Sequence, residues 1–219
     1  MNINPNQIHS ITVLGCGGTG SHIAAGLARL QIAVQSLDGK FPAVRLCDPD
    51  IVELPNVGRQ LYGRSDIGVN KATALANRIN LNYGFEWTAS DVDGTSHLNI
   101  VCVDSRRARH AIYAKSASTY RRNHYIDCGN EASTGQVILG GSELPLPNKA
   151  FPTLTDRRLK DDNTPSCSLA EALEHQELFI NQAIATYALQ LVWSIFRYGN
   201  VNCRGYFINL NGSTQPIKF

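Results

Sequence analysis

The chain has no long apolar run and no run of more than two basic residues, and each absence excludes a class of protein. No apolar stretch approaches the ~20 residues that a membrane span needs. The formal net charge is only +2, which disfavours nucleic-acid binding. Residues 1–10 lack the charged and apolar regions of a secretory signal. We therefore expect a cytoplasmic protein that binds neither a membrane nor a nucleic acid.

Paired cysteines are also lacking. The six cysteines are widely spaced and include no C-x-x-C pair, so we expect neither a structural zinc site nor a disulfide framework. Cys47 and Cys102 lie inside apolar, strand-like runs, and Cys128 closes another. These three positions are typical of small buried hydrophobic side chains.

The length and the alternation of elements predict one domain over residues 1–219. Hydrophobic residues make up 43% of the chain and charged residues 17%, as in globular proteins. Apolar strands alternate with helices, which predicts an α/β fold with a doubly wound, mostly parallel, Rossmann-like sheet. The expected strands are 11–15, 41–48, 85–90, 98–104 and 124–129, and the expected helices are 16–32, 68–81 and 105–121.

Beyond residue 129 the alternation stops. Residues 135–141 form a strand that no helix precedes, so an antiparallel direction is expected. The proline-rich segment 142–167 is expected to be a long crossover loop. One long apolar helix is predicted over 168–199, and its segment 178–196 serves either core packing or a dimer surface. Residues 200–219 predict a terminal hairpin with antiparallel strands.

A glycine-rich segment joins the first expected strand to the first expected helix. Residues 15–20 read G-C-G-G-T-G and contain Gly15, Gly17, Gly18 and Gly20. Glycines permit a tight turn and let a ligand touch the backbone, and a helix N-terminus offers N–H groups to a phosphate. We interpret the segment as a nucleotide-binding loop, with a merely structural turn as the alternative.

Polar residues of both signs gather after the second strand, where residues 48–60 read D-P-D-I-V-E-L-P-N-V-G-R-Q. Asp48 stands where an acid would bind ribose hydroxyls, which by itself favours NAD(P). A nicotinamide site has no need for Asn56, Arg59 and Gln60 beside that acid. The tract therefore favours a different nucleotide.

Lys71 and Asp104 favour ATP. Lys71 falls in the first turn of an expected helix, where the macrodipole disfavours a cation by about 0.3–1 kcal/mol unless an anion faces it. Asp104 closes the expected strand 98–104, at the sheet edge where ligands bind. Cations for phosphate groups and a single carboxylate for Mg²⁺ make an ATP site.

These motifs together resemble the E1-like superfamily, which includes ThiF, MoeB and the ubiquitin-activating enzymes. The resemblance rests on G-x-G-G-x-G, D-x-D-x-V-x-x-x-N-x-x-R-Q, a lysine 11 residues after that glutamine, and a strand ending in aspartate. It covers about residues 10–200. Residues 126–140 and 165–182 further resemble the ThiF-type proteins of PRTRC gene clusters.

The resemblance implies ATP-dependent adenylation of the C-terminal carboxylate of a ubiquitin-like or sulfur-carrier protein. It implies that Asp48 holds the ribose, that Asn56, Arg59 and Lys71 face the phosphates, and that Gln60 supports them. Arg59 and Lys71 would thus act in catalysis. An exposed ion-pair arginine and a solvated helix lysine are the alternatives.

Asp104 would hold Mg²⁺, and Asp50 either takes part directly or caps the turn. In the family, a cysteine of the crossover loop takes the activated protein as a thioester or takes part in sulfur transfer. Cys167, before the expected helix N-terminus, matches that position, and a helix N-terminus favours the thiolate. An inert loop cysteine is the alternative.

The sequence departs from the family in two places. The paired C-x-x-C motifs that hold zinc in ThiF and MoeB are absent. MoeB-like dimers lend an N-terminal arginine to the partner's site, whereas the first arginine here is Arg29, inside an expected helix. A homodimer and an E2-like acceptor protein remain expectations from the resemblance.

Three other functions compete with this reading. The same ATP chemistry could act on a small molecule or on a tRNA base, although the near-neutral charge speaks against tRNA. A non-catalytic nucleotide-binding partner would not need the complete polar set. An NAD-dependent dehydrogenase ranks last.

Overall fold

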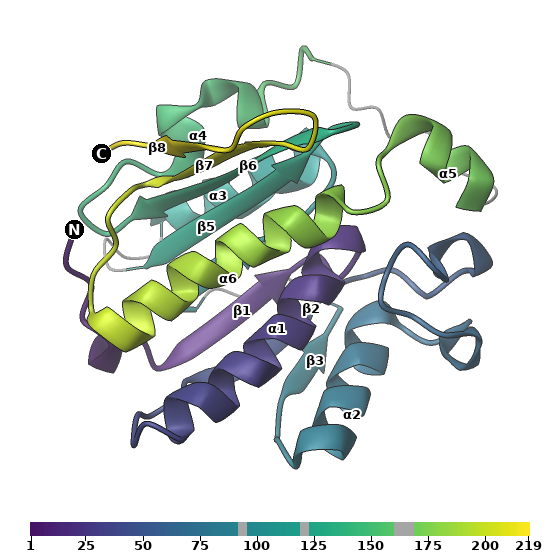
Figure 1. Ribbon diagram of the computed structural model, residues 1–219, viewed down its shortest axis with the longest axis horizontal. Coiled ribbons are helices and arrows are strands. Elements are labelled where there is room, and N and C mark those ends of the chain that lie inside the picture. The colour runs from purple at the N-terminus through teal and green to yellow at the C-terminus, as the bar shows by residue number, and fades with distance from the viewer. Residues whose placement is uncertain (92–95, 119–122, 160–168) are drawn as a thin grey trace.

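The computed structural model describes residues 1–91, 96–118, 123–159 and 169–219. Its strands form a sheet in the order β3-β2-β1-β4-β5-β6-β7-β8 (Figure 1). The strands are β1 (Ser10–Leu14), β2 (Ala43–Cys47), β3 (Thr88–Ser90), β4 (Leu98–Val101), β5 (His124–Asn130), β6 (Thr134–Gly141), β7 (Gly205–Asn209) and β8 (Gln215–Ile217). The helices are α1 (Gly18–Gln35), α2 (Lys71–Tyr83), α3 (Arg106–Ser118), α4 (Pro147–Ala150), α5 (Leu169–His175) and α6 (Ile180–Tyr198).

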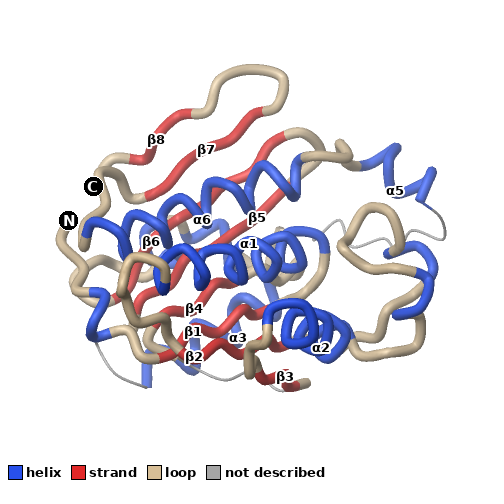
Figure 2. The backbone as a smooth tube through the Cα atoms, turned by 60° about the horizontal axis from the view of Figure 1, so that its bottom comes forward, coloured by secondary structure: helices blue, strands red, loops and turns tan. Residues whose placement is uncertain are grey.

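Two layers of helices cover the two faces of the sheet. On one face, α1, α2 and α6 pack over the strands, and α3 lies behind the opposite face (Figure 2). Apolar residues of α1 and α6 form the main core with β1, β4 and β5. On the other face, Leu14 and Val101 pack with Ile112 and Tyr113 of α3. The predicted α/β fold with a mostly parallel sheet is confirmed.

The strand order reverses next to β1. This strand pairs in parallel with both β2 and β4, and Leu14 stands opposite both Cys47 and Val101. The carboxyl ends of three strands therefore meet at one level of the sheet. In open α/β sheets such a switch point is where ligands bind.

The C-terminal strands run antiparallel, as expected. β6 pairs antiparallel with β5 and with β7, and β7 pairs antiparallel with β8. The terminal hairpin expected in 200–219 is thus confirmed. Cys47 and Cys128 are buried as predicted, whereas Cys102 is only half-buried.

The single long helix expected over 168–199 is wrong, because the chain breaks between α5 and α6. The backbone N–H of Glu177 donates to the carbonyl of Ala132 at 2.9 Å. Gln176 accepts a hydrogen bond from the side chain of Asn181 at 2.8 Å. One tertiary and one local contact thus replace intrahelical bonds at the break. One face of α6 is buried in the core, which accounts for its apolar composition.

Two other expected elements are shorter than predicted. The strand expected over 85–90 is limited to Thr88–Ser90, because the Asn80 side chain binds both backbone groups of Trp87, at 2.8 and 2.9 Å. The expected loop 142–167 contains the short helix α4 and a 3-10 turn at Pro152–Thr155 (η4). Its residues 160–167 lie outside the described chain.

A buried ion pair joins α3 to β5. The Arg109 Nε lies 3.1 Å from Oδ2 of Asp127, which also accepts from the Tyr113 hydroxyl at 2.6 Å. Asp127 is completely buried. Burial raises the pKa of Asp127, although Arg109 and Tyr113 oppose the shift. Arg109 also donates to the carbonyl of Val103 at 2.8 Å, so it fixes the segment after β4.

We expect Arg109→Met to lower the free energy of unfolding by about 3–5 kcal/mol, because it leaves the Asp127 carboxylate buried without its partner. Urea denaturation measures this change. Replacing both residues, with Arg109→Met and Asp127→Leu, should recover at least half of the loss. A single-variant loss below about 1 kcal/mol would contradict this account.

Candidate nucleotide-binding site

The glycine loop packs tightly against the end of β4. Gly15 has φ of +90°, and a Cβ there would lie 2.7 Å from the carbonyl oxygen of Cys102. A Cβ on Gly20 would lie 1.8 Å from the carbonyl oxygen of Gly15. A left-handed φ and two backbone approaches explain why these two positions need glycine. The loop therefore has one compact shape.

The middle of the loop is open. A Cβ built on Gly17 would have no heavy atom within 4 Å, outside its chain neighbours. Gly17 is the N-cap of α1 and provides no side-chain hydrogen bond to the helix. Gly18 faces the side chain of Asn181 instead. A ligand can thus approach the backbone at Gly17, in front of the partial positive charge of α1.

Asp48 ties the tract after β2 to the glycine loop. It is only 5% exposed. Its Oδ2 accepts a hydrogen bond from the backbone N–H of Cys16 at 2.5 Å, and its Oδ1 accepts one from that of Asp50 at 2.9 Å. Burial raises the pKa of Asp48, and the two backbone N–H bonds oppose that shift. A carboxylate oxygen can accept more than one bond, so this arrangement leaves acceptor capacity for a ribose hydroxyl.

Lys71 opens α2 and points back to the same tract. The residue is 8% exposed, and its Nζ lies 2.9 Å from Oδ2 of Asp50. Asn70 caps α2 by accepting from the N–H of Thr73 at 3.0 Å, and its amide donates to the carbonyl of Asp48 at 2.7 Å. Lys71 does lie in the first turn of a helix, as predicted. The anion that faces it here is Asp50, whose side chain is 66% exposed.

Asn56, Arg59 and Gln60 follow in and after the 3-10 turn Leu54–Asn56 (η2). The Asn56 side chain accepts from the N–H of Glu53 at 2.8 Å, which holds the turn. Arg59 is half-buried, burial lowers its pKa, and its Nε donates to the carbonyl of Pro55 at 3.2 Å. Gln60 is 8% exposed, and its buried Oε1 has no hydrogen-bond partner within the described chain. An unpaired buried acceptor is costly, which suits a site completed by a ligand.

Tyr62 is a contributor that sequence reasoning missed. Its hydroxyl donates to the carbonyl of Cys16 at 2.7 Å and lies 3.2 Å from that of Lys71. Through these two contacts the buried Tyr62 side chain bridges the glycine loop and α2. The Ser21 hydroxyl adds a second link, accepting from the N–H of Leu61 at 3.2 Å. Tyr62 follows residues 48–60 and belongs to none of the motifs, so neither its spacing nor its residue type indicated this role.

Asp104 lies on the other side of the glycine loop, beyond β4. The strand ends at Val101, not at Asp104 as expected, because Arg109 takes the carbonyl of Val103 and draws the chain out of the sheet. The Asp104 side chain is exposed. Among the residues that the structure describes, no group of three or more His, Cys, Asp or Glu could hold a metal ion. The predicted nucleophile Cys167 lies outside the described residues.

The sequence matches the ThiF family model over residues 7–218. The chain belongs to the ThiF family. The resemblance of its motifs to the E1-like superfamily, which includes this family, is thus confirmed at the level of the family. No curated protein shows a significant sequence match to the chain. The helices of the described ranges include none long and apolar enough to cross a membrane.

Solved structures share the fold. MccB from E. coli, in its succinimide complex, aligns with a TM-score of 0.62 and 17% identity over 95% of this chain and 64% of MccB. The structure of E. coli MccB with ATP aligns with a TM-score of 0.62 and 15% identity, over 98% of this chain and 66% of MccB. PaaA aligns with a TM-score of 0.63 and 18% identity, over 95% of this chain and 72% of PaaA. The chain thus spans less than two-thirds of MccB in the first of these alignments, and at these identities the likeness establishes the fold.

The contrast between Gly17 and Gly20 is testable. We expect Gly20→Ala to lower the thermal unfolding midpoint by several degrees, because its Cβ collides with backbone. Gly17→Ala should leave that midpoint nearly unchanged and weaken ATP binding by about tenfold or more, because its Cβ occupies space in front of α1. Calorimetry measures both quantities. Unchanged ATP affinity in Gly17→Ala would remove this loop from the binding site.

Proposed function

We propose that the protein uses ATP to adenylate a carboxylate, with the nucleotide bound over the glycine loop. The main support is the junction of Asp48 with the N–H of Cys16, which places an acid for the ribose beside the N-terminus of α1. Lys71 is buried and Arg59 is half-buried, and both cations lie on the β2 side of that junction. They suit the β- and γ-phosphates, whose charge they would neutralise.

Three further features fit a bound nucleotide. The unpaired Oε1 of Gln60 would gain a partner, and the open backbone at Gly17 would gain a phosphate. Asp50, as the present partner of Lys71, would give up that cation to the phosphates. Because Asp50 is mostly exposed, releasing it to water costs little.

We assign Mg²⁺ to Asp104. Magnesium is commonly bound by one or two carboxylates together with substrate phosphates, so a single exposed acid at this edge fits its donor preference. The ion would supply charge neutralisation at the phosphates. Asp104 itself would orient it from the β4 side, and Arg109 would hold the backbone that carries Asp104.

For the substrate, we propose the C-terminal carboxylate of a small ubiquitin-like or sulfur-carrier protein. MccB, which shares the fold, has been solved in complex with MccA. The narrower assignment of residues 126–140 and 165–182 to the ThiF-type proteins of PRTRC clusters, and a cytoplasmic location, are part of this proposal. A homodimer, an E2-like acceptor and a thioester on Cys167 belong to the same proposal.

ATP–pyrophosphate exchange, with magnesium and with or without a candidate carrier protein ending in glycine, tests the function. We expect exchange only when the carrier is present, because the carboxylate is the nucleophile. Exchange without any carrier would favour another acceptor, such as a small molecule. Bound ATP with no exchange under any condition would favour a non-catalytic nucleotide-binding partner.

Lys71→Gln should lower the exchange rate by about 10²-fold or more, because it removes a preorganised cation from the phosphates. Lys40→Gln is the matched control. Lys40 is exposed and precedes the N-terminal end of β2, whereas the proposed site follows the C-terminal end of that strand. The unfolding midpoint should stay close to that of the wild type in both variants. Equal rates for Lys71→Gln and Lys40→Gln would contradict the assigned role.

Cys167→Ser separates the thioester step from adenylation. We expect adenylate to form normally in this variant, while a reductant-sensitive adduct with the carrier disappears, because oxygen at this position cannot form a thioester. Mass spectrometry of the carrier complex detects both species. If the adduct persists in Cys167→Ser, another residue carries the thioester.

A further inference from the structure

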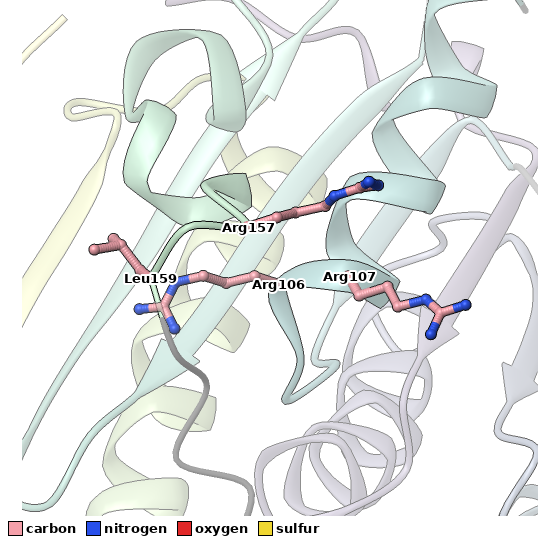
Figure 3. A pocket seen from close by; sticks show the side chains of 4 residues that line it. All are labelled: Arg106, Arg107, Arg157 and Leu159. Atoms are coloured by element: carbon pink, nitrogen blue, oxygen red, sulfur yellow. The ribbon is translucent and has the colours of Figure 1, made fainter.

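Three arginines line a pocket next to the proposed site, on the face of the sheet that α3 covers. Arg106 and Arg107 come from the first turn of α3, and Arg157 and Leu159 come from the segment after η4 (Figure 3). The pocket has a volume of about 400 Å³. Its lining contains no acidic residue within the described ranges. Arg107 and Arg157 extend to one side in Figure 3, and Arg106 extends to the other, toward Leu159. Arginine side chains that share one lining favour an anionic ligand with several oxygens.

The pocket is held in place by its own neighbours. The Arg106 Nε donates to the carbonyl of Thr153 at 3.3 Å and so joins α3 to η4. Asp156, the acid beside Arg157 in the chain, is bound by the Arg158 guanidinium through both carboxylate oxygens, at 2.9 and 2.8 Å. Arg158 is thus the main partner of that acid, and Arg106 also acts on its carboxylate and lowers its pKa. The positive charge of the pocket therefore rests on Arg107 and Arg157.

The position of the pocket indicates what kind of anion it takes. Arg106 follows the proposed magnesium ligand Asp104 by two residues, on the β4 side of the glycine loop. Lys71 and Arg59 lie on the β2 side, where β2 pairs with the opposite edge of β1. In phosphoryl and nucleotidyl transfer, the attacking and leaving oxygens lie roughly in line. If pyrophosphate leaves toward Lys71 and Arg59, the attacking carboxylate arrives from the β4 side.

We propose that this arginine pocket binds acidic side chains of the substrate protein, close to the C-terminal carboxylate that is adenylated. The role in catalysis rests on the proposed function, whereas the binding itself does not. Arginine recognises carboxylates through paired N–H donors, so it would both attract and orient an acidic segment. The pocket thereby selects a carrier protein with acidic residues near its C-terminus.

Fluorescence anisotropy with two labelled peptides, Glu-Glu-Glu-Gly-Gly and Gln-Gln-Gln-Gly-Gly, tests the pocket on the full chain at about 0.15 M salt. We expect the glutamate peptide to bind at least about tenfold more tightly than the glutamine peptide. Arg107→Glu and Arg157→Glu should each remove about tenfold or more of that affinity, and Arg157→Gln should remove less. Arg29→Glu, an exposed site on α1 with the same change of charge, should have no effect.

Several outcomes would overturn the proposal, and the ATP–pyrophosphate exchange assay separates its failure from failure of the proposed function. Equal affinity for the two peptides, or an equal loss in Arg29→Glu, would show that only net charge is involved. If inorganic pyrophosphate displaces the peptide and Arg157→Glu weakens pyrophosphate binding to the same degree, the pocket serves the product. Failure of ATP–pyrophosphate exchange alongside selective peptide binding would reject adenylation and retain the pocket. Exchange with no peptide discrimination would do the reverse.

Discussion

The hydrogen bond from the N–H of Cys16 to the Asp48 carboxylate is the interaction on which the site depends. It joins the end of β1 to the end of β2 within the glycine loop itself. A nearly buried carboxylate is costly unless it is hydrogen-bonded, and here two backbone N–H groups satisfy it. The Tyr62 hydroxyl then ties the carbonyl of Cys16 to α2. The loop, the tract and the first turn of α2 therefore form one rigid unit.

This unit divides the sheet edge into two sides. On the β2 side stand the cations that suit a triphosphate, and on the β4 side stand Asp104 and the arginine pocket. The buried pair Arg109–Asp127 links that second side to the core, because Arg109 also holds the carbonyl of Val103. Preorganised charge on both sides of a reacting phosphorus is the arrangement that adenylation needs, since positioning and charge neutralisation account for most of such catalysis.

Much of this arrangement could be predicted from the sequence. Local motifs predicted the glycine turn, the place of Lys71 in the first turn of a helix, and the antiparallel C-terminal strands. Individual side-chain and backbone contacts limited the rest. The break before α6 involves the distant Ala132. The short β3 depends on Asn80 and the end of β4 on Arg109, which lie near in the chain but bind backbone groups in a way that periodicity does not predict. The pairing of Lys71 with Asp50, 21 residues apart in the chain, is likewise not evident from the motif spacing.

A crystal structure of the protein with magnesium and a non-hydrolysable ATP analogue is the measurement that tests the central claim most directly. We predict the ribose at Asp48, the phosphates in front of Gly17, and Lys71 moved from Asp50 to the phosphate oxygens. The α-phosphorus should lie between the β2-side cations and Asp104. A nucleotide bound away from the glycine loop, or one that leaves Lys71 paired with Asp50 and Gln60 unpaired, would contradict the account.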